Sequence, residues 1–273
     1  MASRKNLVSV VIPVYNGERY LGEAFDSVMS QGHRPIEVIV VDDGSTDNTE
    51  TVARRFSDSI TYIQQENRGP ASARNRGLQL SHGDIISFLD ADDLWSENKL
   101  SLQLARLTDN PFAEIVLGLS QPMKLHAEEE GNAHFEKWHD PFCALLLSAG
   151  VFRKSVFEKV GLFDETLYYG EDTDWFMRAR EMGVSMAIVE DVTLFYRRHE
   201  SNMTLDSTAR NRYFIRALKK SLDRRRKETG GVVTPIQELA YPGKVVDLNR
   251  RVADAGEEFA RRHSDSSNGR AAD

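Results

Sequence analysis

Short runs of hydrophobic residues alternate with longer amphipathic stretches along about the first 120 residues of the chain. The runs are typical of buried strands, whereas the stretches, with an apolar residue every three or four positions, predict helices. The predicted strands cover residues 8–12, 37–41, 60–64 and 85–89, and the predicted helices cover residues 20–31, 49–56 and 71–80. Because the strands and helices alternate through short loops, we expect an α/β fold with a mostly parallel central sheet flanked by helices.

The second half of the chain has a less regular pattern. Residues 121–140 contain a run of glutamates and three histidines whose spacing matches no zinc site, so we expect a solvated loop or an excursion towards a ligand. Residues 142–152 are apolar again, and a further helix is expected to begin after Gly170. An amphipathic helix is predicted over residues 204–228, and residues 264–273 have the composition of a frayed tail.

Composition and charge narrow the functional class. Of the 273 residues, 40% are hydrophobic and 28% are charged, which is typical of a soluble globular protein. The net charge of −7 argues against binding to nucleic acid, because it adds to the repulsion from the phosphate backbone. The single cysteine, Cys143, excludes an internal disulfide and favours a cytoplasmic setting.

Two features bear on membranes. No stretch reaches the roughly 20 apolar residues that a membrane-spanning helix needs, although peripheral contact with a membrane stays open. The basic run at residues 224–227 favours a solvated helix terminus, where cations oppose the negative end of the helix dipole. A patch that faces a membrane is the less favoured alternative.

Three carboxylates, Asp90, Asp92 and Asp93, come directly after the predicted strand at residues 85–89. Like charges this close repel one another, and folding alone gives no reason to keep them. A divalent cation bound to phosphate oxygens would give that reason, because Mg²⁺ and Mn²⁺ take carboxylates together with substrate phosphates. The alternative is a polar corner in which Asp93 caps a helix that begins near Ser96.

Three polar loops are expected to meet at one edge of the sheet. They cover residues 13–17, 42–47 and 90–93, and each follows a predicted strand. In open parallel sheets, ligands bind in the crevice beyond the carboxyl ends of the strands. The order of the loops along the chain therefore predicts a shared ligand site.

Six parts of the sequence, in the right order, resemble family-2 glycosyltransferases. They cover residues 10–16, 40–47, 67–69 with 73–77, 88–93, 170–174 and 196–199. One such motif is a weak signal, whereas six in register are a strong one, and the resemblance extends over roughly residues 7–202. It implies a GT-A fold with a Rossmann-like nucleotide-binding half, and an inverting transfer of a sugar from a nucleotide diphosphate donor to an acceptor hydroxyl.

The resemblance also implies a division of the chain. We expect a GT-A domain over residues 1–203, in which residues 7–112 bind the nucleotide sugar and residues 113–203 form the acceptor side. Residues 204–273 are expected to form a helical C-terminal extension that ends in a disordered tail.

By the same resemblance, the acidic cluster holds a metal ion. Asp92 would contact Mn²⁺ or Mg²⁺ while Asp90 faces the ribose, and Asp93, which follows at once, leaves the division among the three open. His199 would be a further ligand of the metal or the diphosphate, and an imidazole suits Mn²⁺ better than Mg²⁺. A metal at this place would neutralise the charge that builds up as the diphosphate leaves.

The donor nucleotide is expected at the ends of the first two strands. Asp43 can accept the N3 proton of uracil, and Asp42 could do the same or cap the loop. Pro13 and Tyr15 would shape the pocket of the base. Arg74 could reach a ribose or diphosphate oxygen, or instead form a salt bridge with a nearby aspartate. A UDP-sugar is the default and favoured donor, with GDP- and dTDP-sugars as alternatives.

Inverting transfer needs a base that removes the proton of the acceptor hydroxyl. Asp172 takes that role by its place in the family pattern, with Glu171 and Asp174 as competitors. The alternative is that these acids only favour the N-terminus of a helix. The acceptor stays open among a glycan, a lipid-linked molecule, a peptide and a small molecule, and the sequence predicts no oligomeric state.

Other enzyme classes can be weighed on the same motifs. A dinucleotide-dependent oxidoreductase would have a Gly-x-Gly-x-x-Gly turn where this chain has residues 13–17, so that class is excluded. A metal-dependent phosphohydrolase or nucleotidyltransferase could use the same carboxylates and is the alternative to a glycosyltransferase.

Overall fold

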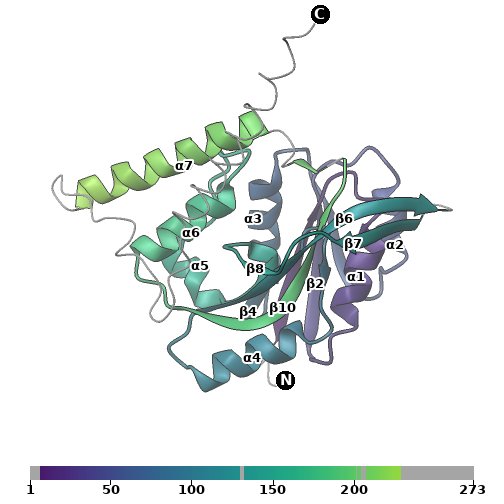
Figure 1. The fold of residues 1–273 in the computed structure, drawn as a ribbon, viewed down its shortest axis with the longest axis horizontal. Helices are drawn as coiled ribbons and strands as arrows, with labels where there is room; N and C mark the ends of the chain where they lie inside the picture. Colours follow the sequence, from purple (N-terminus) through teal and green to yellow (C-terminus); the bar gives the residue numbers. More distant parts are fainter. Residues whose placement is uncertain (1–6, 130–131, 201, 204–206, 229–273) are drawn as a thin grey trace, which may run out of the picture. The chain divides into compact units, whose positions relative to one another are not determined.

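Figure 1 shows a computed structural model of the chain, which describes residues 7–129, 132–200, 202–203 and 207–228. These residues belong to one compact unit, Met1–Val233. The predicted C-terminal tail lies outside the described residues.

One sheet runs through the unit in the strand order β3-β2-β1-β4-β9-β6-β10-β5, and β7 and β8 pair with β6. Its strands are β1 (Val8–Val14), β2 (Ile36–Asp42), β3 (Ile60–Gln64), β4 (Ile85–Phe88), β5 (Leu94–Trp95), β6 (Ile115–Glu129), β7 (Asn132–Lys137), β8 (Phe142–Cys143), β9 (Gly150–Arg153) and β10 (Met186–Arg198). β1 pairs in parallel with β2 and β4, and β2 pairs in parallel with β3. The first four strands thus have the predicted parallel arrangement, and β9 joins them antiparallel to the parallel pair of β6 and β10.

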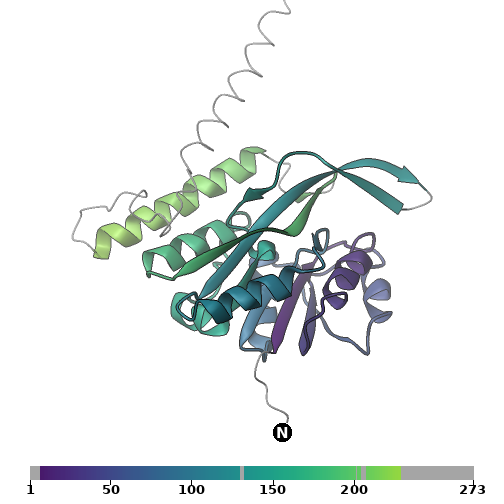
Figure 2. The same cartoon turned by 60° about the horizontal axis from the view of Figure 1, so that its bottom comes forward.

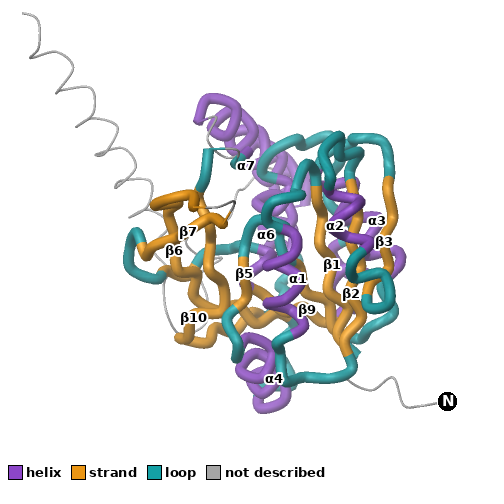
Figure 3. Tube along the Cα trace, turned by 90° about the vertical axis from the view of Figure 1, so that its right-hand side faces the viewer, coloured by secondary structure: helices purple, strands orange, loops and turns teal. Residues whose placement is uncertain are grey.

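The helices of this unit pack around the sheet, as Figure 3 shows in purple and orange. They are α1 (Leu21–Met29), α2 (Thr49–Arg54), α3 (Pro70–Leu80), α4 (Lys99–Asp109), α5 (Lys154–Val160), α6 (Glu171–Glu181) and α7 (Ser207–Glu228). Successive side chains of a strand point to opposite faces, so Val38 and Val40 pack in the same core as α1, whereas Ile39 and Val41 pack with Ala73 of α3. The predicted α/β class is confirmed.

Gly77 allows α3 to lie very close to β1. A Cβ atom at Gly77 would come within 2.3 Å of Cγ1 of Val11, so no larger residue fits without a shift of the helix. The close approach fixes the position of α3 on the sheet. Arg74, less than one turn earlier on the same helix, is held near the carboxyl ends of the strands as a result.

The prediction of a loop over residues 121–140 was wrong, because most of this segment forms a hairpin of β6 and β7. The start of β6 is buried between β9 and β10, and the strand continues past them into the hairpin, which Figure 2 shows at the upper right. Partly buried Met123 and Leu125 alternate with exposed Lys124 and His126. This period of two is the signal of a strand, and the glutamate run after it obscured the pattern.

An aromatic cluster and a buried ion pair fix α6. Trp175 is fully buried, its ring stacks on that of Phe157 with 4.8 Å between the centroids, and its Nε1 donates a hydrogen bond of 2.9 Å to the carbonyl of Gly161. The buried carboxylate of Asp174 accepts hydrogen bonds of 2.9 Å from Arg178 and from Arg224 of α7. The first turn of α6 therefore has a well-defined position.

The C-terminal part of the described chain is helical, as predicted, because α7 covers residues 207–228 and packs on α6. Within the described ranges, no helix combines the length and the apolar character that crossing a membrane requires.

Candidate active site

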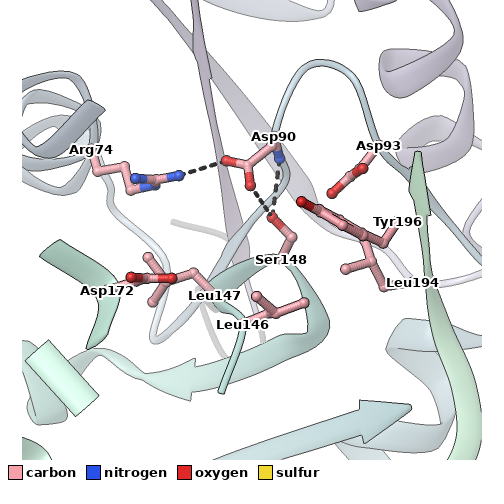
Figure 4. Close-up of a pocket in the computed structure, with 9 residues that line it drawn as sticks. All are labelled: Arg74, Asp90, Asp93, Leu146, Leu147, Ser148, Asp172, Leu194 and Tyr196. Atoms are coloured by element: carbon pink, nitrogen blue, oxygen red, sulfur yellow. Dashed lines mark hydrogen bonds and ion pairs between the residues drawn. The ribbon is translucent and has the colours of Figure 1, made fainter. Parts of the chain in front are cut away.

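A pocket lies beside the acidic segment that follows β4 (Figure 4). It is lined by Arg74, Asp90, Asp93, Leu146, Leu147, Ser148, Asp172, Leu194 and Tyr196. Three predicted site residues, Arg74, Asp90 and Asp172, come from the helix after β3, the loop after β4 and the start of α6. Residues that are far apart in the sequence therefore meet at one place, and of the three loops expected to share a site only the one at residues 90–93 lines this pocket.

Arg74 connects the carboxylates of this pocket. Its Nη2 donates a hydrogen bond of 2.6 Å to Oδ1 of Asp90, and its Nη1 donates one to Oε1 of Glu171. Asp90 is held from the other side by Ser148, whose hydroxyl lies 3.1 Å from its Oδ2. Of the two alternatives for Arg74, the structure contains the salt bridge, and its Nε is buried without a hydrogen-bond partner among the described residues.

Glu171 and Asp172, in the first turn of α6, are both influenced by burial and by the charge of Arg74, but they have different hydrogen-bond partners. Burial raises the pKa of Glu171 to about 7, although the neighbouring Arg74 cation acts in the opposite direction. Burial also raises the pKa of Asp172, again against the charge of Arg74. Oδ1 of Asp172 accepts a hydrogen bond of 2.6 Å from the backbone N–H of Thr173, and its Oδ2 has no hydrogen-bond partner in the described part of the chain.

The raised pKa of Glu171 predicts a pH-dependent part of the stability. Between about pH 4.5 and pH 7 the folded protein keeps a proton on Glu171 that the unfolded chain releases. The stabilisation from this proton is complete below about pH 4.5 and is lost as the pH rises through about 7. Urea unfolding of wild type and Glu171→Gln across this range should therefore give a free-energy difference that falls as the pH rises.

The exposed Glu66, which forms no hydrogen bond or ion pair within the described residues, offers a matched control. Glu66→Gln should leave the pH profile of the free energy of unfolding unchanged. A Glu171→Gln profile parallel to that of wild type would contradict the raised pKa.

Asp92 and His199 form a pair next to the pocket. His199 Nε2 lies 3.1 Å from Oδ2 of Asp92, and Nδ2 of Asn202 donates a hydrogen bond of 2.9 Å to the same oxygen. The imidazole packs on the ring of Tyr20 with 4.5 Å between the centroids. Among the described residues, no group of three or more histidine, cysteine or acidic side chains is arranged to hold a metal ion, so this pair would need ligands from a substrate.

Asp93 differs from the other two aspartates because it is almost fully buried. Its Oδ1 accepts a hydrogen bond of 2.8 Å from the backbone N–H of Arg197. Burial, followed by the charges of Asp92 and Asp90, raises its pKa well above the ordinary value. Asp93 therefore fastens the acidic loop to β10 and does not cap a helix near Ser96, since the short strand β5 follows it.

The predicted nucleotide residues lie at the ends of β1 and β2, outside the pocket of Figure 4. Asp43 is buried, and its carboxylate accepts hydrogen bonds from the side chain of Gln65 and from the backbone N–H groups of Arg68 and Gly69, at 2.7–3.0 Å. Its backbone N–H donates to the carbonyl of Val14, the last residue of β1, at 2.8 Å.

Two further predicted residues lie at the end of the first strand, Pro13 within β1 and Tyr15 directly after it. Pro13 is partly buried, whereas the side chain of Tyr15 is 51% exposed. Asp42 is fully buried and accepts hydrogen bonds from the hydroxyl of Tyr62 and the backbone N–H of Ser45, at 2.6 and 2.7 Å. It thereby stabilises the loop after β2.

Four residues of the site were missed by the sequence analysis: Ser148, which holds Asp90, Asn202, which holds Asp92, Arg197, which holds Asp93, and Tyr20, which packs on His199. Arg197 belongs to the segment at residues 196–199 that matched the family pattern, so its place there was a usable signal. Single serine, asparagine and tyrosine residues carry no such signal.

Comparison with known sequences agrees with the family resemblance found in the sequence motifs. Residues 9–124 match the model of a family described as glycosyl transferase family 2. An uncharacterised glycosyltransferase of Rickettsia typhi is 37% identical over 196 residues, which are 65% of this chain and 60% of that protein. The glycosyltransferase GlyA of Streptococcus pneumoniae is 35% identical over 164 residues, which are 59% of this chain but 21% of that protein. The chain thus spans less than two thirds of the relatives that it matches.

Solved structures share the fold. TarS of S. aureus in complex with UDP has a TM-score of 0.57 at 21% identity, over 81% of this chain and 73% of that one. A mannosyltransferase of Pyrobaculum calidifontis in complex with GDP-Man and Mn²⁺ has a TM-score of 0.61 at 21% identity, over 79% of this chain and 64% of that one. At these identities the likeness shows the fold alone.

Proposed function

Because this chain contains a family-2 glycosyltransferase domain with the GT-A fold, we propose that it transfers a sugar from a nucleotide diphosphate sugar to an acceptor hydroxyl, with inversion at the sugar carbon. The observation that carries the proposal is the convergence of Arg74, Asp90 and Asp172 in one pocket. Arg74 is a cation that can bind phosphate or ribose oxygens, Asp90 adds a carboxylate, and Asp172 is a second carboxylate that can act as a base.

The donor is proposed to bind across the ends of β1 and β2. Three of the roughly four acceptor positions of the Asp43 carboxylate are taken by Gln65, Arg68 and Gly69, which leaves one for the N3 proton of uracil. Pro13 and the half-exposed ring of Tyr15 would form the side of the base pocket. A UDP-sugar is favoured on this ground, although the mannosyltransferase structure holds a GDP-sugar.

Asp92 and His199 are the proposed metal ligands. A carboxylate and an imidazole fit Mn²⁺, and Mg²⁺ less well, with diphosphate oxygens to complete the coordination. Asn202 and Tyr20 would orient the two ligands, because they contact Oδ2 of Asp92 and the imidazole ring, respectively. When bound, such a cation neutralises the negative charge of the leaving diphosphate.

Asp172 is the proposed general base. The carboxylate of Asp174 is occupied by Arg178 and Arg224, and Glu171 is paired with Arg74. Asp172 accepts no hydrogen bond from an arginine, unlike Glu171 and Asp174, and its Oδ2, which has no hydrogen-bond partner in the described residues, can accept the proton of an acceptor hydroxyl. Its raised pKa makes it a stronger base than an exposed aspartate.

The chemical class of the acceptor stays open, and the cytoplasmic location is a prediction from the sequence. The acceptor side is proposed to include the apolar wall of the pocket, Leu146, Leu147 and Leu194. In Figure 4 Leu147 lies beside Asp172 and Leu194 beside Tyr196, so these apolar side chains would exclude water from the place where the sugar is transferred.

Calorimetric titration with UDP, GDP and dTDP, each with and without Mn²⁺, tests the proposal. We expect wild-type protein to bind one nucleotide, UDP by preference, more tightly when Mn²⁺ is present. Binding of inorganic phosphate with Mn²⁺ but of none of the three nucleotides would instead favour a metal-dependent phosphohydrolase, and the transferase proposal would fall.

A further inference from the structure

The helix α7 has two different faces, and the inner one accounts for its attachment to the protein. Ala217, Ser221 and Arg225 are buried on this face. Arg224 donates to Asp174 and to Glu181 at 2.9 and 2.7 Å, and Lys220 pairs with Asp164. The inner face is thus fixed by ion pairs to α6 and to the loop before it.

The outer face combines exposed apolar and basic residues. Ile215 is 64% exposed and Phe214 is 41% exposed. At 100° per residue, Leu218 and Leu222, both half-buried, lie between these two, and Phe214 stands at the border with the inner face. The exposed basic residues Arg212, Arg216, Lys219 and Arg226 follow on its other side.

The basic residues of the outer face have few partners. Arg226 lies 4.0 Å from Asp223, whereas Arg212, Arg216 and Lys219 form no ion pair among the described residues. The sequence of α7 contains nine lysines and arginines and two acidic residues, although the whole chain has a net charge of −7. A strong local positive charge on an acidic protein therefore remains available to an anionic partner.

We propose that the outer face of α7 docks on the surface of an anionic phospholipid bilayer. Phe214 and Ile215 would enter the boundary between headgroups and acyl chains, and Arg212, Arg216 and Lys219 would contact the phosphates. A helix with one basic and one apolar side is the arrangement that lies in such an interface. The charge of the helix is complementary to that of the lipid.

The combination of the two kinds of residue selects a lipid surface over other partners. A nucleic acid would use the arginines but would leave Phe214 and Ile215 in water. A second copy of this chain would cover the apolar residues but would bring two basic helices together. The bilayer satisfies both sides of the face, and this inference does not depend on the transferase activity.

Sedimentation of the full chain with phosphatidylcholine vesicles, with and without phosphatidylglycerol, tests the proposal. Wild type should bind only the vesicles that contain the anionic lipid, and added salt should weaken the binding. Each basic residue near such a surface strengthens binding about fivefold, so Arg212→Gln combined with Lys219→Gln should weaken it about 25-fold. Ile215→Ser should also weaken it, through the loss of apolar contact.

Matched controls lie elsewhere on the protein. Arg55→Gln with Arg106→Gln removes two exposed arginines of other segments, and Phe112→Ser removes an apolar side chain that is 86% exposed. Both controls should bind as wild type does, and circular dichroism should show equal helix content in all variants.

Three outcomes would overturn the proposal. They are a wild type that does not sediment with anionic vesicles, a loss of binding that is equal in the α7 variants and the controls, and an Ile215→Ser variant that binds as tightly as wild type. In the last case α7 would be a general polyanion-binding surface, and an oligonucleotide should compete with the vesicles.

Discussion

Asp172→Asn should lower kcat by about 10²–10⁴-fold, the range by which a positioned general base accelerates a reaction. Asparagine has nearly the same shape, and its Oδ1 can still accept the hydrogen bond from the backbone N–H of Thr173. It cannot take the proton of an acceptor hydroxyl. Nucleotide affinity, measured by calorimetry, should stay close to that of wild type, because Asp172 is proposed to act on the acceptor and not on the donor.

The pH dependence of the activity is a second test of the role of Asp172. Burial raises the pKa of Asp172, so the activity of wild type should fall on the acidic side at a higher pH than an exposed aspartate would cause. This acidic limb should be absent from the residual activity of Asp172→Asn.

Glu171→Gln and Asp174→Asn serve as comparisons for Asp172→Asn. Asp174 is bonded to Arg178 and Arg224, so its replacement should lower the free energy of unfolding more than it lowers kcat. If Glu171→Gln lowers kcat by about 10²–10⁴-fold and Asp172→Asn leaves kcat close to that of wild type, the base is Glu171.

Asp92→Ala should weaken the Mn²⁺-dependent part of nucleotide binding by at least about 100-fold. Loss of a residue that only orients a metal ligand already costs 10–100-fold, and the loss of a ligand itself should cost more. The variant should bind the nucleotide with nearly the same affinity whether Mn²⁺ is present or absent. Titration of Mn²⁺ against the protein at saturating nucleotide measures the effect.

Two controls separate metal binding from folding. Asp58→Ala removes an exposed carboxylate from another loop and should leave the Mn²⁺ dependence unchanged. Asp92 also accepts a hydrogen bond from Asn202, and its loss lowers stability. Thermal unfolding therefore checks that the Asp92→Ala protein is still folded at the temperature of the titration. An unaltered Mn²⁺ dependence in a folded Asp92→Ala protein would move the metal site to Asp90 or Asp93.

The N-terminal half of the fold was accessible from the sequence because its strands are buried on both faces. Continuous apolar runs such as residues 37–41, rich in valine and isoleucine, are typical of such strands, and the carboxyl ends of parallel strands must meet at one edge. The β6–β7 hairpin was missed because its alternating residues, Met123 and Leu125 among them, are only partly buried and are followed by glutamates.

The candidate site was accessible where acidic or basic residues come directly after a strand or begin a helix, as with Asp90, Arg74 and Asp172. It was not accessible where the partner is distant. Ser148 is 58 residues from Asp90, and Asn202 is 110 residues from Asp92. Only the folding of β9 and β10 into the same sheet brings these polar side chains to the loop after β4.

The most direct test of the central claim is to identify the bond that breaks in the donor. Without an acceptor, water can slowly replace the acceptor hydroxyl, so the sugar nucleotide that binds best is incubated with the protein in ¹⁸O-labelled water. Inverting transfer breaks the bond between the sugar carbon and the phosphate oxygen, and it therefore predicts the label in the released sugar and none in the nucleoside diphosphate. Label in a phosphate group would contradict the account and would show a phosphohydrolase.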